Sequence, residues 1–390
     1  MAINGNEYPV TRKICVKARM SFATPALLGS GEGENTDNDI IRDGSGNVFL
    51  PGSSVAGVLR ELLPPKDKEA LFGNKDKTMS PMWVLDTELP DAVVIALDGV
   101  ALDERDRFNK IAKPTSKYDF ECVDAGLEFD LRLMLVERTN NHAVKPLFDN
   151  VLSALQQGKV RFGGKTNRGF GELKCVSLTG VTYSKAEGTL KNWLDFDWRQ
   201  PLKPYTPETK YIDTRFDTLT AKLKLDGSIM VRDFKSLKDK EQYAHLTANG
   251  MPVIFGTSWA GCFRSWLLKW VPNDASLINE MFGYMDKKTT KPSQIKFLSS
   301  YLTATDSAVD GWRTVVRVKI DRFTGGASDG ALFTSRPWFG GETELRILYP
   351  KNKPQYARLL NVAIEALKKG MLTIGGETSI GRGVFKEATK

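Results

Sequence analysis

Two glycine-rich stretches decide the fold: Gly163-Gly-Lys-Thr-Asn-Arg-Gly-Phe-Gly171 and Gly375-Gly-Glu-Thr-Ser-Ile-Gly-Arg-Gly383. Each follows an Ala-Leu-x-x-Gly pattern, at Ala154–Gly158 and Ala366–Gly370, and the two elements are equally spaced in both halves. Self-similarity of this kind is typical of an internal duplication. The chain is therefore expected to contain two copies of one module.

Further elements recur in the same order in the two halves. They are a Gly-Ser/Thr-Ser turn that leads into a helix, a Phe-Gly pair and an acidic-aromatic segment: Pro51–Arg60 with Phe255–Arg264, Leu71–Gly73 with Met281–Gly283, and Leu102–Phe108 with Ile320–Phe323. Each half also opens on an alternating strand, with apolar positions at Ile14, Val16, Ala18 and Met20, and at Leu219, Ala221, Leu223 and Leu225. We expect Ser53 or Ser54, and Thr257 or Ser258, to cap the two helices.

The order strand, turn, helix, strands, helix, strand predicts an α+β fold, with a split βαβ (ferredoxin-like) unit and an antiparallel sheet in each copy. We expect a first domain at residues 1–183, a linker at residues 184–217 and a second domain at residues 218–390. The linker is indicated by Pro201, Pro204 and Pro207.

Composition narrows the class of partner. The 390 residues carry a net charge of +8, with a pI near 9.1, which favours RNA, DNA or an acidic membrane surface as the partner. The four cysteines form no CxxC pair, which argues against a disulfide framework and a structural zinc site. The only histidines are His142 and His245. We expect a cytoplasmic protein, because no stretch has the pattern of a signal peptide or a membrane span.

The sequence resembles the RAMP superfamily, the modified RRM-like folds from which CRISPR effector backbones are built. Three features carry the resemblance: the acidic loop before Phe49–Ser54, the segment Ile320–Ala327, and the glycine-rich loop of both halves. Two such domains in one chain look most like the fused double-RAMP subunit of variant type III-D effectors, and the subtype stays open. The resemblance implies a CRISPR guide RNA, a complementary target RNA and other effector subunits as partners, and no membrane.

Three groups of residues are candidate RNA contacts: the glycine-rich loops, the helices after the Gly-Ser/Thr-Ser turns, and the acidic-aromatic segments. Glycines allow backbone N–H groups to approach a phosphate, and neighbouring cations add charge. Helix-borne arginines either contact phosphates or are solvated charges. The resemblance implies thumb-like hairpins at residues 105–120 and 322–333, in which a phenylalanine wedges into the guide–target duplex or packs on the core. The candidates are Ser53, Ser54, Arg60, Arg107, Phe108, Gly163, Gly164, Lys165, Arg168, Thr257, Ser258, Arg264, Arg322, Phe323, Gly375, Gly376 and Arg382.

The acidic loop at residues 29–43 is the candidate catalytic element. In the resembled subunits an aspartate at this place helps to cleave target RNA with a divalent metal, Mg²⁺ or Mn²⁺, and Asp37 matches it best, as catalytic residue and metal ligand. The second copy has a lysine-rich loop instead. There Asp239 is preferred, Glu241 and Asp233 are alternatives, and an inactive second site is a further alternative.

The leading hypothesis is a guide-RNA-binding backbone subunit that cleaves bound target RNA at one or two metal-dependent sites. A purely structural RNA-binding subunit is one alternative. A metal-independent nuclease that processes guide RNA by general acid–base chemistry is another, although the scarcity of histidine argues against it.

Overall fold

The computed structural model describes residues 8–388 except 32, 34–35, 75–77, 103–111, 142–143, 234–242 and 286–289. The chain forms two compact units. Unit 1 comprises residues 1–95, 121–164 and 171–213, and unit 2 comprises residues 96–120, 165–170 and 214–390. Unit 2 thus includes two segments of the first repeat. The domain boundaries proposed from the sequence stay a prediction.

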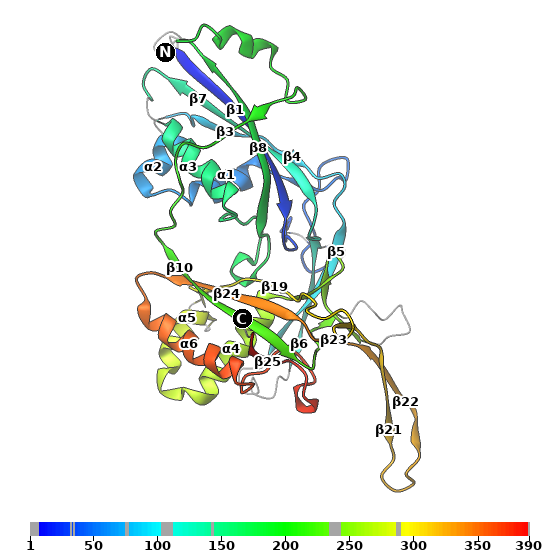
Figure 1. Cartoon of the computed structure of the whole chain (residues 1–390). Helices are drawn as coiled ribbons and strands as arrows, with labels where there is room; N and C mark the ends of the chain where they lie inside the picture. Colours follow the sequence, from blue (N-terminus) through cyan, green and yellow to red (C-terminus); the bar gives the residue numbers. More distant parts are fainter. Residues whose placement is uncertain are drawn as a thin grey trace. The chain divides into compact units, whose positions relative to one another are not determined.

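Unit 1 is built on a five-stranded sheet in the order β3-β7-β1-β8-β9 (Figure 1). Its strands are β1 (Val10–Phe22), β3 (Met82–Val84), β7 (Glu128–Arg138), β8 (Leu173–Ser184) and β9 (Lys203–Pro204). The central strand β1 pairs antiparallel with both β7 and β8. The predicted alternation is confirmed, because Ile14, Val16, Ala18 and Met20 are completely buried.

Three helices of unit 1 pack on one face of this sheet: α1 (Gly52–Arg60), α2 (Pro65–Phe72) and α3 (Lys145–Gln156). The predicted N-caps are wrong. Helix α1 begins at Gly52 after an extended Pro51, and the matching helix of the second repeat begins at Gly256 after an extended Phe255. Each helix begins before its hydroxyl residues, so Ser53 and Ser54 in α1, and Thr257 and Ser258 in α4, lie inside the first turn.

Unit 2 repeats the architecture with a four-stranded sheet in the order β18-β24-β10-β25. Its elements are β10 (Phe216–Asp226), α4 (Gly256–Trp270), α5 (Ala275–Phe282), β18 (Lys296–Phe297), β24 (Glu342–Pro350), α6 (Pro354–Lys368) and β25 (Val384–Glu387). In both sheets the first strand of the repeat lies between the third and the fourth, and the second strand pairs with the third. This is the ferredoxin-like order, so the predicted fold class is confirmed.

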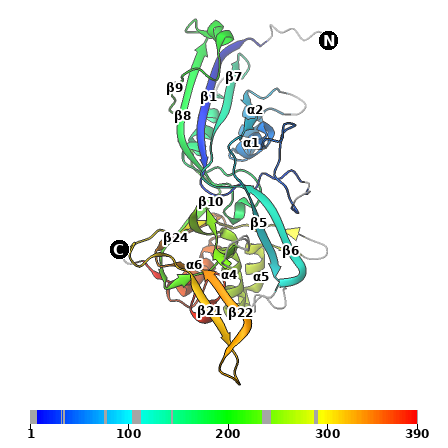
Figure 2. The same cartoon turned by 90° about the vertical axis from the view of Figure 1, so that its right-hand side faces the viewer.

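Each repeat also contains a ladder of paired strands outside its main sheet, which is a separate two-stranded sheet in the first repeat and part of the four-stranded sheet β12-β13-β22-β21 in the second (Figure 2). In the first repeat it joins β5 (Val94–Leu102) and β6 (Ala112–Val123), and in the second it joins β21 (Val315–Ile320) and β22 (Ala327–Arg336). The ladder of β21 and β22 projects from the rest of unit 2 in both views.

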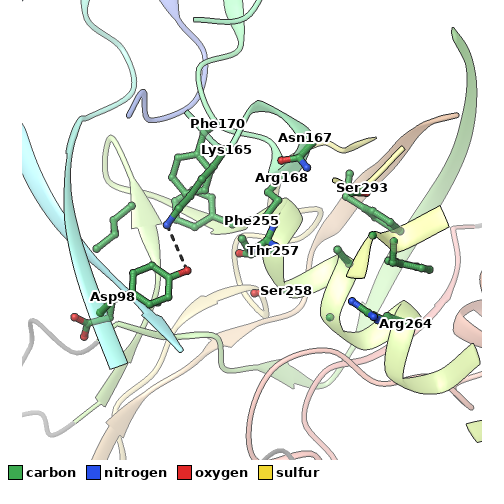
Figure 3. Close-up of a pocket in the computed structure, with 18 of the residues that line it drawn as sticks. Asp98, Lys165, Asn167, Arg168, Phe170, Phe255, Thr257, Ser258, Arg264 and Ser293 are labelled. Carbon is green, nitrogen blue, oxygen red and sulfur yellow. Dashed lines mark hydrogen bonds between the residues drawn. The ribbon is translucent and has the colours of Figure 1, made fainter. Parts of the chain in front are cut away.

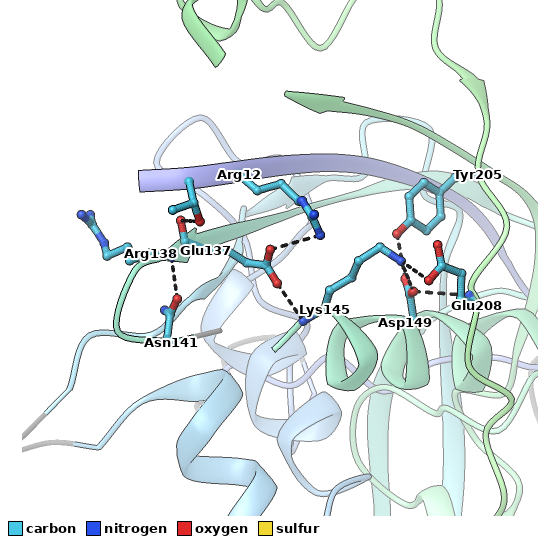
Figure 4. Close-up of polar contacts among 9 residues, drawn as sticks. Arg12, Glu137, Arg138, Asn141, Lys145, Asp149, Tyr205 and Glu208 are labelled. Atoms are coloured by element: carbon cyan, nitrogen blue, oxygen red, sulfur yellow. Dashed lines mark hydrogen bonds and ion pairs between the residues drawn. The ribbon is translucent and has the colours of Figure 1, made fainter. Parts of the chain in front are cut away.

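Most of the predicted linker packs on unit 1. The side chain of Asp149 on α3 is completely buried and accepts hydrogen bonds from Lys145 Nζ at 2.7 Å and Tyr205 Oη at 2.7 Å (Figure 4). Lys145 also forms an ion pair with Glu208 at 2.8 Å. Burial and the neighbouring Asp149 carboxylate raise the pKa of Tyr205. These contacts fix residues 205–208 against α3.

Short elements complete the structure: β2 (Phe49–Leu50), β4 (Thr87–Glu88), β11 (Ser228–Ile229), β12 (Arg232–Asp233), β13 (Tyr243–His245), β14 (Thr247–Ala248), β15 (Met251–Ile254), β16 (Tyr284–Met285), β17 (Thr290–Lys291), β19 (Ser300–Tyr301), β20 (Gly311–Trp312) and β23 (Trp338–Phe339). The described part of the chain contains no helix whose length and apolar character would let it cross a membrane.

Candidate functional site

A cavity of about 840 Å³ opens in unit 2 (Figure 3). Residues from segments 97–99, 118–120 and 165–170 of the first repeat line it together with residues from α4, from β12 and from segments 282–284 and 290–297 of the second. Among the described residues its cationic side chains outnumber its acidic ones: Lys165, Arg168, Arg232, Arg264 and Lys291 against Asp98 and Asp233. This surplus of positive charge suits an anionic ligand. We call this cavity the basic groove.

Helix α4 forms one wall of the basic groove. Thr257, Ser258, Gly261, Arg264 and Ser265 all line it, because residues three, four and seven positions apart share one face of a helix. The Arg264 guanidinium also donates from Nη2 to Asn279 Oδ1 at 3.0 Å, and this bond orients it. The first turn of α4 contains no acidic residue, so the partial positive charge of its N-terminus is not offset from within the helix.

The first glycine-rich loop also lines the groove and adjoins the start of α4. Lys165 adopts a left-handed conformation, with φ of 53°, and is followed by the 3₁₀ turn Thr166–Arg168. Its ammonium lies 3.3 Å from the centroid of the Phe120 ring and 3.4 Å from Tyr118 Oη. The aromatic side chains of β6 thus hold Lys165, while Arg168 is exposed.

The second loop has the same backbone and the opposite charge. Glu377 occupies the place of Lys165, with φ of 58°, before the 3₁₀ turn Thr378–Ile380. Its carboxylate lies 2.9 Å from Arg317 Nη2 and 3.0 Å from Arg382 Nε. Arg382 is only 5% exposed, and burial lowers the pKa of its guanidinium. The structure therefore places Arg382 in an internal ion pair, and its contact with RNA stays a prediction.

The glycines of both loops have a structural role. Gly163 and Gly375 have φ of 91° and 87°, in the left-handed region that disfavours other residues. Gly164 N donates to Leu27 O at 2.8 Å, and Gly376 N makes the matching bond in the second repeat at 2.7 Å. These two N–H groups already have partners within the chain, so the side chains around the loops are better candidates for phosphate contacts.

The matching face of α1 differs from that of α4. Ser53 and Ser54 are exposed and Arg60 is half-buried at the end of the helix. However, Gly52 N donates to the Asp86 carboxylate at 2.6 Å. A carboxylate at a helix N-terminus offsets the partial positive charge there, so α1 attracts a phosphate less strongly than α4.

The acidic loop of the first repeat is ordered by its own side chains. Asp39 accepts hydrogen bonds from Thr36 N and Thr36 Oγ1, both at 2.8 Å, and Glu121 N donates to Asn38 O at 3.0 Å. Asp37 lies exposed between these anchors. In the second repeat Asp233 lies on β12, whereas Asp239 and Glu241 lie outside the described residues.

Of the predicted thumb residues, only those of the second repeat lie within the described part of the chain. Arg107 and Phe108 lie outside the described residues. Arg322 and Phe323 lie at the tip between β21 and β22, where Phe323 is 98% exposed and does not pack on the core. Asp321 accepts hydrogen bonds from Phe323 N at 3.0 Å and Thr324 N at 2.9 Å, and these bonds lower the pKa of Asp321. The turn at the tip thus presents the Phe323 ring to solvent.

His245 lies in the interior of unit 2 and is 1% exposed. Its Nδ1 accepts a hydrogen bond from Val231 N at 3.0 Å, and burial lowers its pKa to about 3. The ring is therefore neutral at physiological pH and is shielded from any ligand.

Sequence reasoning missed several residues of the basic groove: Asp98, Tyr118, Asn167, Arg232 and Lys291. Arg232 and Lys291 flank charged loops, but such residues are usually solvated surface charges. Only the folded chain shows that they converge.

The comparisons with known proteins identify the family. The model of the RAMP superfamily matches residues 19–174 and 235–386, which cover most of both repeats. The chain therefore belongs to the RAMP superfamily. A solved structure described as the cryo-EM structure of the type III-B Cmr-beta bound to cognate target RNA is similar, with 12% identity and a TM-score of 0.35 over 44% of this chain and 96% of that one. This likeness is too low to inform function. No curated protein matches the sequence.

Proposed function

We propose that this protein is a guide-RNA-binding backbone subunit of a type III CRISPR effector complex, and that the basic groove of unit 2 holds the sugar–phosphate backbone of the guide. Membership of the RAMP superfamily supports the class of protein. The observation that carries the proposal is the convergence of Lys165, Arg168 and Arg264 on one cavity. The two RAMP domains in one chain favour the fused subunit of type III-D effectors.

The side chains of the groove suit a phosphodiester backbone better than a stack of bases. Phe120, Phe170 and Phe255 line it but are almost completely buried, and the half-buried rings of Tyr118 and Tyr284 each have a lysine ammonium over one face. Arg168 and Arg264 offer forked N–H donors that match phosphate oxygens. Such contacts release counterions, and they make the affinity depend on salt rather than on sequence.

The binding proposal is tested with Arg168→Ala and Arg264→Ala in the full chain. Each substitution should weaken binding of a labelled single-stranded RNA and should reduce the slope of log affinity against log salt by about 0.7 for each phosphate that the protein no longer neutralises. Lys174→Ala, which removes an exposed cation from β8 in unit 1, is the matched control. Unchanged affinity and slope in both groove variants would overturn the assignment of RNA to this groove.

We further propose that Asp37 takes part in metal-dependent cleavage of target RNA, with Asp239 in the corresponding role in the second repeat. In the described part of the chain no group of three or more His, Cys, Asp or Glu residues is placed to hold a metal ion. This fits a hydrated Mg²⁺ or Mn²⁺ that one carboxylate holds together with RNA phosphates, rather than a protein cage. When bound, the ion would stabilise charge at the scissile phosphate. The exposed Asp37 carboxylate would orient the ion's water shell.

The cleavage proposal is tested in a reconstituted complex. Asp37→Asn should abolish one cut in the target RNA and leave guide binding intact, and Asp239→Asn should abolish a second cut if both sites act. Asp43→Asn, in the same loop, is the control. Intact target RNA with the unsubstituted protein and Mg²⁺ would favour a purely structural subunit, and cleavage that persists in EDTA would favour a guide-processing nuclease. The burial of His245 counts against that last role for this residue.

A further inference from the structure

Gly261 stands in the interior of α4, where glycine is an unfavourable residue. Glycine weakens a helix relative to alanine, because it loses more backbone freedom on folding. It is tolerated where a side chain would collide with a neighbour. At Gly261 a Cβ atom would meet none of the described residues within 4 Å, and the position is exposed. Packing within the chain therefore does not account for this glycine.

Two other glycines near the groove, unlike Gly261, are required by the fold. At Gly256, the first residue of α4, a Cβ would collide with Phe297 O and would come within 2.5 Å of Arg168 O. At Gly169 a φ of 85° places the backbone in the left-handed region. The fold requires these two glycines. In α1, Gly57 matches Gly261 in the repeat, and there too a Cβ would have no described neighbour within 4 Å.

The position of Gly261 in the basic groove supplies a reason. It lies one helical turn after Thr257 and Ser258 and one turn before Arg264, and all four line the cavity. A turn of helix rises by about 5.4 Å, so a strand that follows this wall passes over Gly261 on its way between the N-terminus of α4 and the guanidinium. The loop that carries Lys165 borders the same cavity.

We propose that Gly261 is the point at which the bound RNA backbone approaches the protein most closely, and that it determines how deeply the strand enters the groove. This inference rests on the proposed binding of guide RNA. A Cβ methyl group would project from the helix by about 1.5 Å and would lift the strand away from Arg264 and from the helix N-terminus. Both interactions are electrostatic and short-ranged in salt, so the change would fall on affinity.

Gly261→Ala gives a test in which stability and binding change in opposite directions. The variant should unfold at a higher temperature than the unsubstituted protein, since alanine favours the helix and meets no neighbour. Its affinity for a labelled single-stranded RNA should fall about tenfold, the effect of weakening about one charge-assisted contact, and Gly261→Leu should weaken binding further. Gly57→Ala controls for the helix effect and should also raise the unfolding temperature. Arg264→Ala, measured in parallel, reports whether RNA occupies the groove.

The outcomes separate this inference from the proposed function. If Gly261→Ala raises the unfolding temperature but leaves RNA affinity unchanged while Arg264→Ala lowers it, the groove binds RNA and the role of Gly261 is refuted. A lower unfolding temperature for Gly261→Ala would show that the fold requires this glycine, and would also refute the inference. If neither variant changes the affinity, the proposed groove itself fails.

Discussion

The buried His245 makes the stability of unit 2 depend on pH in a way that can be calculated. An unfolded chain binds a proton on histidine below a pKa of about 6.5. In the folded protein burial lowers the pKa of His245 to about 3, and Nδ1 accepts a hydrogen bond from Val231 N, so the ring stays neutral. Between these two pKa values the unfolded state holds a proton that the folded state lacks, and acidification favours unfolding.

The magnitude follows from the gap between the two values. Each pH unit below about 6.5 costs about 1.4 kcal/mol, so the contribution of His245 is fully present above that pH and has fallen by about 2 kcal/mol at about pH 5. The whole gap corresponds to about 5 kcal/mol, which disappears as the pH falls to about 3. Carboxylates titrate in the lower part of this range, so the upper part is the informative window.

Urea unfolding of the unsubstituted protein and of His245→Gln, followed by tryptophan fluorescence, measures the effect. The glutamine side chain can accept the hydrogen bond from Val231 N but does not titrate. Between about pH 7 and about pH 5 the unsubstituted protein should lose about 2 kcal/mol more stability than the variant. His142 is present in both proteins and cancels in the difference. Equal losses in the two proteins would refute the assignment of a neutral, buried His245.

Four other substitutions test ion pairs and hydrogen bonds within the two units. Asp149→Ala removes the buried acceptor on α3 and should cost about 3 kcal/mol in urea unfolding, because it breaks a buried ion pair, whereas Glu208→Ala, on the exposed side of the same network, should cost much less. Glu377→Gln removes the carboxylate that Arg232, Arg317 and Arg382 share, and it should increase hydrogen exchange in β21. A Glu→Gln substitution in a loop without such contacts should leave the exchange unchanged. Asp321→Ala should disorder the tip turn, and the unsubstituted turn should loosen as the pH falls through the lowered pKa of Asp321, measured by NMR relaxation at the tip.

Local patterns made the architecture predictable. The alternating strands at residues 14–20 and 219–225 placed the first strand of each sheet, because a period of two marks a half-buried strand. The repeated glycine-rich loops fixed the correspondence between the halves, and both have matching left-handed residues, Lys165 and Glu377. The exact start of α1 and α4 was mispredicted, since the extended residue before each helix is followed at once by helical backbone.

The candidate site was less predictable. Contacts between segments far apart in the sequence decide which charged side chains are buried and which of them meet in the basic groove. A glycine-rich loop gives no sign that Arg382 turns inward to Glu377 while Arg168, in the matching loop, stays exposed. Nor does the spacing along the chain reveal that residues 96–120 and 165–170 pack with the second repeat. The basic groove exists only through that packing.

The two repeats also differ at the N-termini of α1 and α4, the helices that follow the Gly-Ser/Thr-Ser turns. In the first repeat Asp86 accepts a hydrogen bond from Gly52 N and places a negative charge at the start of α1. In the second, Ser299 follows β18 at the corresponding place, and its hydroxyl donates to Gly169 O at 3.0 Å. The exchange of a carboxylate for a hydroxyl removes a charge that would repel phosphate, and the serine at the same time ties the first glycine-rich loop to unit 2. One substitution thus keeps a carboxylate away from the N-terminus of α4 and helps to hold the loop that lines the groove beside it, so two copies with one fold present different charges at this helix.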